Sequence, residues 1–133
     1  MWSKRQSVDY ALQRRNALTR LRSRVRSVTP ADLCDADPML IRAALHHGEL
    51  STVRCPVNDC GRLVTLNYTF GDQLGQYSGR IKSEAELEEM ENEVGEFLVR
   101  VVEVCTECGW NHMIASYQLG DGVVRRPPRR QKT

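Results

Sequence analysis

Four of the five cysteines in this 133-residue chain fall in two short motifs, and these are the residues best suited to chemistry. The motifs are Cys55-Pro-Val-Asn-Asp-Cys60-Gly-Arg and Cys105-Thr-Glu-Cys108-Gly-Trp, with 44 residues between them. In each motif the spacing lets two sulfurs reach one cation, and the glycine that follows suits a tight turn. Cys55, Cys60, Cys105 and Cys108 are therefore predicted to bind one metal ion together.

Four thiolates suit zinc, a borderline-soft ion whose tetrahedral shell they fill at about 2.3 Å, leaving no position for a substrate. The motifs thus predict a structural zinc ion in a zinc-ribbon arrangement. Two disulfides or four buried thiols are alternatives, but disulfides need an oxidising compartment, to which nothing in the chain points. A redox Cys-x-x-Cys should open a helix, whereas Cys105 and Cys108 lie between two predicted strands. His112 could replace one cysteine ligand.

Three apolar segments around the motifs predict strands. Residues 63–70 alternate, with Val64, Leu66, Tyr68 and Phe70 on one face, and residues 96–104 and 110–119 complete an antiparallel sheet. Between the motifs, Ser83-Glu-Ala-Glu86 is a capping box that opens an acidic helix over residues 83–94. The strands and this helix form the predicted zinc-ribbon domain.

The first 50 residues are predicted to be helical. Apolar residues between Ser7 and Ser27 recur at mostly helical spacing with arginines between them, and Ser7 or Asp9 could cap this helix. Thr29-Pro30 predicts a short helical turn. Asp37 as N-cap and Pro38 as first residue predict a helix over residues 39–47, which Gly48 is expected to end in the left-handed conformation.

The net charge of +2 conceals a strong asymmetry. Residues 1–30 carry a net charge of +7, residues 31–120 carry −9, and residues 121–133 carry +4. Basic ends of this kind often contact nucleic acid or an acidic protein surface. The alternatives are that the ends only solvate the chain, or that they fold back on the acidic helix.

These patterns predict an α+β fold, a small zinc-ribbon three-stranded antiparallel sheet preceded by an N-terminal helical pair, with an acidic helix inserted between the two cysteine motifs. The expected divisions are a basic helix and helical hairpin (1–50), the zinc-ribbon domain (51–120) and a basic disordered tail (121–133). Cys34 is interpreted as a small buried hydrophobe, because it has no nearby thiol partner in the sequence. His46 and His47 are interpreted as groups that face the C-terminal dipole of the helix.

Three stretches together resemble an uncharacterised zinc-ribbon family of actinobacteria: Val8-Asp-Tyr-Ala-Leu-Gln-Arg-Arg15, Cys34-Asp-Ala-Asp-Pro-Met-Leu-Ile-Arg-Ala-Ala-Leu-His-His-Gly48, and Val102-Glu-Val-Cys-Thr-Glu-Cys-Gly-Trp-Asn-His112. The resemblance covers nearly the whole chain. It implies a function that is unknown and a first cysteine motif of the form Cys-Pro-x-Cys. Here that motif is two residues longer.

No catalytic motif is recognisable, so we expect a non-enzymatic protein without a small-molecule substrate. The absence of a signal peptide or long apolar segment predicts a cytoplasmic protein that does not enter the membrane. The leading hypothesis is a zinc-binding accessory factor that associates with RNA polymerase. The ribosome is the second choice, because the acidic middle would be repelled by RNA-rich surroundings. Direct nucleic-acid binding and a cysteine-based redox enzyme are further alternatives. The expected contacts to partners or phosphates come from Arg14, Arg15, Arg22, Arg26, Arg125, Arg126, Arg129 and Arg130.

Overall fold

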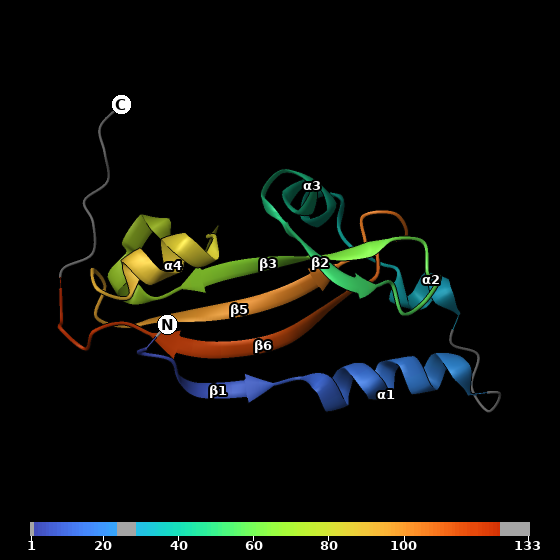
Figure 1. Ribbon diagram of the computed structural model, residues 1–133, viewed down its shortest axis with the longest axis horizontal. Helices are drawn as coiled ribbons and strands as arrows, with labels where there is room; N and C mark the ends of the chain where they lie inside the picture. The colour runs from blue at the N-terminus through green and yellow to red at the C-terminus, as the bar shows by residue number, and fades with distance from the viewer. Residues whose placement is uncertain (1, 24–28, 126–133) are drawn as a thin grey trace.

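The computed structural model describes residues 2–23 and 29–125, which form helices around one antiparallel sheet (Figure 1). Arg26, Arg126, Arg129 and Arg130, and the predicted disorder of the tail beyond residue 125, lie outside these ranges. The elements in chain order are β1 (Arg5–Asp9), α1 (Ala11–Arg22), α2 (Pro30–Leu33), α3 (Pro38–His47), β2 (Glu49–Arg54), β3 (Arg62–Phe70), the 3₁₀ segment η1 (Asp72–Tyr77), β4 (Arg80–Ile81), α4 (Glu84–Met90), β5 (Phe97–Val104) and β6 (Asn111–Leu119).

The sheet has six strands, so the prediction of three was wrong. Its order is β1-β6-β5-β3-β2, with β4 also paired to β3, and every pairing is antiparallel. The predicted strands correspond to β3, β5 and β6. Of the three additional strands, β1 and β2 lie at the two edges and are largely exposed, and β4 has only two residues. Such edge strands lack the alternation of buried and exposed residues by which a strand is recognised in a sequence.

The predicted N-terminal helix begins later than expected. Residues Arg5–Asp9 form β1, in which Val8 pairs with Ser116 and Asp9 with Ala115 of β6. The helix α1 starts at Ala11, whose backbone N–H donates to the Asp9 carboxylate at 2.7 Å. Residues 7–9 have a helical pattern in the sequence, but they form a strand because they can pair with β6.

The caps of α3 and α4 form as predicted. Asp37 accepts a hydrogen bond from the backbone N–H of Met39 at 2.8 Å, and Ser83 and Glu86 make both bonds of a capping box. Gly48 follows α3, but its φ of −76° is extended rather than left-handed. Glycine is needed there for space, because an added Cβ would lie 1.9 Å from Val64 Cγ1.

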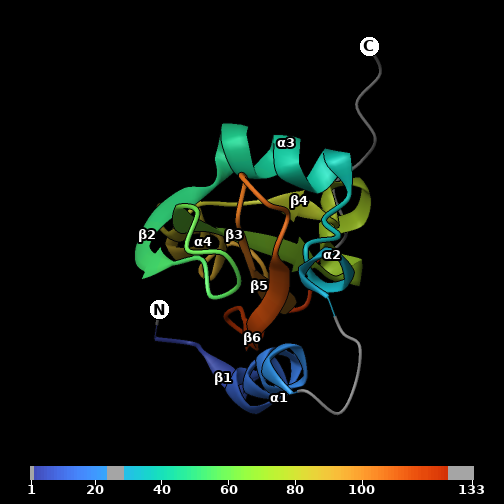
Figure 2. The same ribbon diagram turned by 90° about the vertical axis from the view of Figure 1, so that its right-hand side faces the viewer.

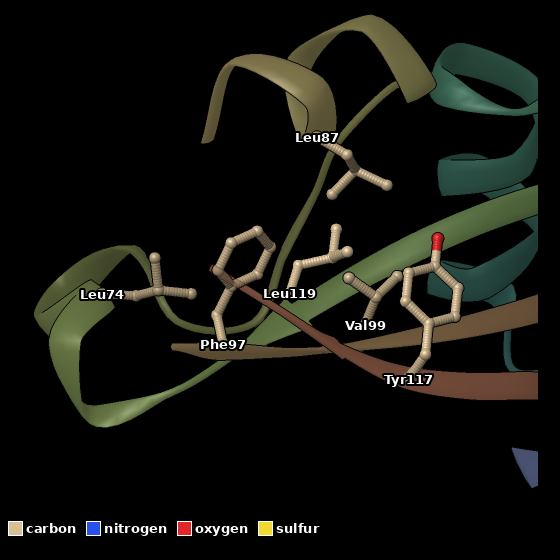
Figure 3. Packing of buried hydrophobic residues seen from close by; sticks show 6 residues of the cluster. All are labelled: Leu74, Leu87, Phe97, Val99, Tyr117 and Leu119. Carbon is tan, nitrogen blue, oxygen red and sulfur yellow. The ribbon is translucent and has the colours of Figure 1, made fainter. Parts of the chain in front are cut away.

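The two faces of the sheet carry different helices. On the face that we name the α4 face, Leu87 of α4 packs on Phe97, Val99, Tyr117 and Leu119 (Figure 3). On the opposite face, named the α3 face, Ala44 of α3 packs on Val64, Leu66 and Val104. Neighbouring residues of a strand point to opposite faces, so these two cores lie on opposite sides of one sheet.

The cysteine loops, residues 55–61 between β2 and β3 and residues 105–110 between β5 and β6, lie at one end of the sheet, which we name the cysteine end. Helix α3 covers the α3 face beside this end, and α4 lies at the other end, the far end (Figure 1). Helix α1 also lies at the cysteine end, because Leu18 is buried in a cluster with Cys55, Leu63, Cys105 and Trp110. Figure 2 shows α3 and α1 on either side of the sheet when viewed from this end.

Candidate metal centre

Each cysteine loop is folded by hydrogen bonds within its own backbone. The Cys55 N–H donates to Gly61 O at 2.8 Å, and the Cys105 N–H donates to Trp110 O at 2.8 Å. Two further bonds fold the turns, from Asp59 N–H to Cys55 O at 3.1 Å and from Gly109 N–H to Cys105 O at 2.9 Å. These turns direct the thiols of both loops into one space at the cysteine end.

The longer first loop is accommodated at Asp59. Its φ of 48° is left-handed, a conformation that aspartate tolerates better than most residues. The Asp59 carboxylate and carbonyl also accept hydrogen bonds from the Arg54 guanidinium, the second at 2.8 Å. The two additional residues of the first motif therefore form a turn that Arg54 stabilises by hydrogen bonds. With this turn, the Cys60 sulfur lies near the sulfurs of the other three cysteines.

The sulfurs of Cys55, Cys60, Cys105 and Cys108 all lie within 4.8 Å of one another. The Cys60 and Cys105 sulfurs are 3.2 Å apart, and those of Cys55 and Cys108 are 3.6 Å apart. A tetrahedral ion with bonds of about 2.3 Å holds its sulfurs about 3.8 Å apart. The four thiols predicted from the sequence thus form a group that could hold a metal ion. All five cysteines of the chain are free thiols.

A fifth thiol, that of Cys34, borders this group. Its Sγ lies 3.3 Å from Cys108 Sγ, and the Asn58 amide donates to it at 3.7 Å. The loop after α2 places it there, since the backbone N–H of Ala36 donates to Gly109 O at 3.0 Å. Cys34 is half-buried and packs against the cluster of Leu18 and Trp110, which agrees with its interpretation as a small hydrophobe, but it also has a thiol partner that we did not expect. The odd number of cysteines was the only sign of this role in the sequence.

The pKa of Cys34 is raised and the pKa of Cys108 is lowered, because the two thiols have different surroundings. Burial raises the pKa of both thiols, but at Cys108 hydrogen bonds from the Trp110 backbone and from the Cys34 thiol stabilise the thiolate and lower its pKa to about 7. Burial and the hydrogen bond to Cys108 raise the pKa of Cys34 to about 12. Cys34 therefore stays protonated and acts as the donor, while Cys108 is the acceptor.

Beneath the cysteine loops, α1 is fixed to the sheet by a buried carboxylate. Glu103 is nearly buried, forms an ion pair with the Arg14 guanidinium, and accepts a hydrogen bond from Trp110 Nε1 at 3.4 Å. Arg14 also lies over the Trp110 ring, 6.0 Å from its centroid. His112 stacks on the same ring at 5.8 Å, outside the four-sulfur group.

The described arginines that we expected to contact a partner differ in exposure and in position. Arg15 and Arg22 are exposed on α1, whereas Arg14 is engaged by Glu103. Arg125 pairs with Asp121 at 2.7 Å, and the backbone of Asp121 bonds to Val94 just beyond α4. The described arginines thus lie at two ends of the molecule. His46 and His47 occupy the last turn of α3 and are exposed.

All residues of the chain, 1–133, match the model of a family described as a family of unknown function, DUF5318. The chain belongs to this family. Similar proteins include the uncharacterized proteins Rv0049 of Mycobacterium tuberculosis H37Rv and Mb0050 of Mycobacterium bovis. Each is 42% identical over 122 residues, which cover 92% of this chain and 88% of the relative. No solved structure matches the chain significantly.

Membership of the DUF5318 family and the mycobacterial relatives agree with the predicted resemblance to an uncharacterised actinobacterial family. The family description assigns no activity. Within the described ranges, no helix is long and apolar enough to cross a membrane.

Proposed function

We propose that the four-cysteine group holds a structural zinc ion. Four sulfurs complete the tetrahedral shell of zinc, and such a site has no open position at which a substrate could bind. Cys55 and Cys105 are buried and belong to the same apolar cluster as Leu18 of α1. A bound ion would therefore fix the two loops, the ends of four strands and the adjacent helix as one rigid unit.

We infer that the protein is a non-catalytic accessory factor of the cytoplasmic gene-expression machinery, with RNA polymerase as the first-choice partner. The observation that carries this inference is the position of α1, whose exposed arginines lie on a helix anchored beside the cysteine group by Leu18 and by the Arg14–Glu103 pair. A cationic helix on a rigid base suits an acidic protein surface or a phosphate backbone. The acidic middle of the chain favours polymerase over the RNA-rich ribosome.

Affinity purification tests this proposal. A tagged protein, purified from its host with nuclease treatment and analysed by mass spectrometry, is expected to retain RNA polymerase subunits. The double variant Arg15→Glu/Arg22→Glu should lose them, whereas Arg42→Glu/Arg80→Glu, an equal change of charge at exposed positions of α3 and β4, should not. Recovery of ribosomal subunits instead would favour the ribosome. Recovery of neither would reject an accessory role in gene expression.

The redox alternative makes a different prediction. A dithiol enzyme would leave Cys105 and Cys108 free to react, whereas a structural site would hold stoichiometric zinc at these thiols and lose its fold in a chelator. Zinc content measured on the purified protein, followed by circular dichroism with and without chelator, separates the two.

A further inference from the structure

The far end of the α3 face is not covered by a helix of the described chain. Helices α1 and α4 cover the two ends of the α4 face, and α3 covers the cysteine end of the α3 face. At the far end of the α3 face, Phe70 and Leu98 are only half-buried and Arg100 is exposed. Tyr68 is also half-buried and lies at the border of this area, where it packs against the α3 cluster. We name this uncovered area the open face.

The open face contains a shallow pocket of about 410 Å³ with an aromatic floor. Tyr68 and Phe70 alternate along β3, and their rings lie 6.4 Å apart with only 20° between their planes. Arg100, which pairs with Tyr68 across β3 and β5, lies over the Phe70 ring at 5.2 Å from its centroid. The remaining lining residues are Leu40, Val102, Asn111 and Met113.

We propose that the open face binds single-stranded nucleic acid by stacking bases on Tyr68 and Phe70. Aromatic rings at alternate positions of a central strand are the arrangement with which sheet-based RNA-binding domains stack successive bases. Arg100 supplies the positive charge, either by a contact to one phosphate or by stacking on a base. This site is separate from α1, so it goes beyond the proposed function and does not depend on it.

Acidic groups limit the size of the bound segment. Asp35 accepts a hydrogen bond from Asn111 at 3.0 Å on the cysteine side of the pocket, and Asp72 and Glu96 line the adjoining pocket beyond Phe70. These carboxylates repel phosphates at both ends of the open face. The bound segment is therefore two or three nucleotides, on the order of the bases that one sheet surface stacks in such domains, and stacking dominates its affinity.

Arg100 argues against a second copy of the chain as the occupant. A twofold interface places the same patch of each protomer against the other, so both exposed Arg100 guanidinium groups would be buried within one small, largely apolar contact. Burying two like charges without an acidic partner disfavours such an interface. A nucleic acid strand instead presents flat bases to the rings and a phosphate to the guanidinium, which would leave its position over Phe70 to reach the phosphate.

Fluorescence anisotropy with a labelled oligonucleotide of about 12 nucleotides, within the footprint of single-strand-binding folds, tests the proposal. The isolated full-length protein is expected to bind it. Phe70→Leu and Tyr68→Leu keep apolar volume on the sheet but remove the ring, and each should weaken binding roughly tenfold, within the range of base–aromatic stacking. Thermal unfolding of the same samples checks that both variants fold.

The dependence of binding on salt gives a second readout. One phosphate contact gives a slope of about −0.7 in a plot of log K against log salt concentration for single strands. The Arg100→Gln variant should flatten this slope, whereas Arg42→Gln, the same change at an exposed position of α3, should leave it unchanged.

The proposal is overturned if the folded wild-type protein does not bind the oligonucleotide, or if both leucine variants bind as the wild type does. It is also overturned if sedimentation shows a dimer that the leucine variants abolish, because the open face would then be an interface between copies. Loss of polymerase co-purification would not affect this result, since the anisotropy assay contains only the purified chain and the oligonucleotide.

Discussion

Cys34 Sγ lies 3.3 Å from Cys108 Sγ, although 74 positions separate the two residues in the chain. Cys34 is outside the group of four sulfurs whose mutual distances suit a single ion. It donates its S–H to the sulfur of Cys108, and so would act on the proposed metal centre through one of its ligands. Groups that hydrogen-bond to a metal ligand fix its orientation and tune the charge that it presents.

Replacing Cys34 should weaken metal binding without abolishing it. In the variant Cys34→Ala the sulfur of Cys108 loses its donor, and loss of such an outer partner typically costs about 10- to 100-fold in metal affinity. Cys34→Ser keeps a donor and should recover part of this loss. Affinities measured by competition with a chromogenic chelator give the comparison.

The stoichiometry of the Cys34 variants separates the donor role from a ligand role. Both should still bind one ion, with the absorption spectrum of cobalt in four-sulfur coordination unchanged in form. A variant at position 34 whose cobalt spectrum lost one sulfur ligand would show instead that Cys34 coordinates the ion.

Removal of the proposed zinc ion should unfold the cysteine end. Trp110 is 1% exposed and belongs to the cluster with Cys55 and Cys105, so its fluorescence reports on this end. Trp2 is 72% exposed and would mask the signal, so the experiment uses a Trp2→Phe background. We expect chelator to move the Trp110 emission to longer wavelength and zinc to reverse the change. An emission spectrum that chelator leaves unchanged, with zinc removal verified, would contradict this expectation.

The sequence was sufficient to predict the group of four cysteines, the three central strands and the two helix caps. In each case the signal is local: a spacing of two thiols, an alternation of apolar residues, or a polar residue two or three positions before its partner. These local rules do not depend on the rest of the fold. They therefore hold even though the strand count and the start of α1 differ from the prediction.

The roles of Cys34 and Arg14 could not be predicted in this way. Arg14 is one of six arginines between residues 14 and 26, and only the packing of α1 on the sheet places Glu103 next to it. Cys34 reaches Cys108 because the loop after α2 bonds to Gly109 of the second cysteine loop. Both relationships are contacts between segments distant in the chain, for which a single sequence carries no periodic signal.

Arg14 and Arg15 should therefore respond differently to the same substitution. Arg14→Ala leaves the Glu103 carboxylate, which is 6% exposed, without its charged partner, and breaking a buried pair in this way typically costs about 3–5 kcal/mol. Arg15→Ala removes an exposed side chain and should change stability by about 0.5 kcal/mol or less. Urea unfolding of both variants measures the difference.

A double variant tests the cause of the Arg14 effect. Arg14→Met/Glu103→Leu replaces the pair by apolar side chains of similar size, and should be more stable than Arg14→Ala because no buried charge remains. Equal stability of the double variant and Arg14→Ala would show that packing of α1, rather than the unpaired carboxylate, sets the cost.

Gly48 and Gly122 give a matched comparison of space and backbone conformation. At Gly48 φ is ordinary, but an added Cβ would lie 1.9 Å from Val64 Cγ1 and 2.5 Å from Ala44 O, so Gly48→Ala must displace α3 from the sheet. We expect a loss of about 1–3 kcal/mol, the range for overpacking a core. At Gly122 no atom lies within 4 Å of the added Cβ, but φ is +79°, and Gly122→Ala should cost about 1–2 kcal/mol of left-handed strain.

The additional variant Val64→Ala distinguishes the two causes. It removes the clashing methyl group, so it should reduce the free-energy cost of Gly48→Ala in a double-variant cycle. The cost of Gly122→Ala should stay unchanged.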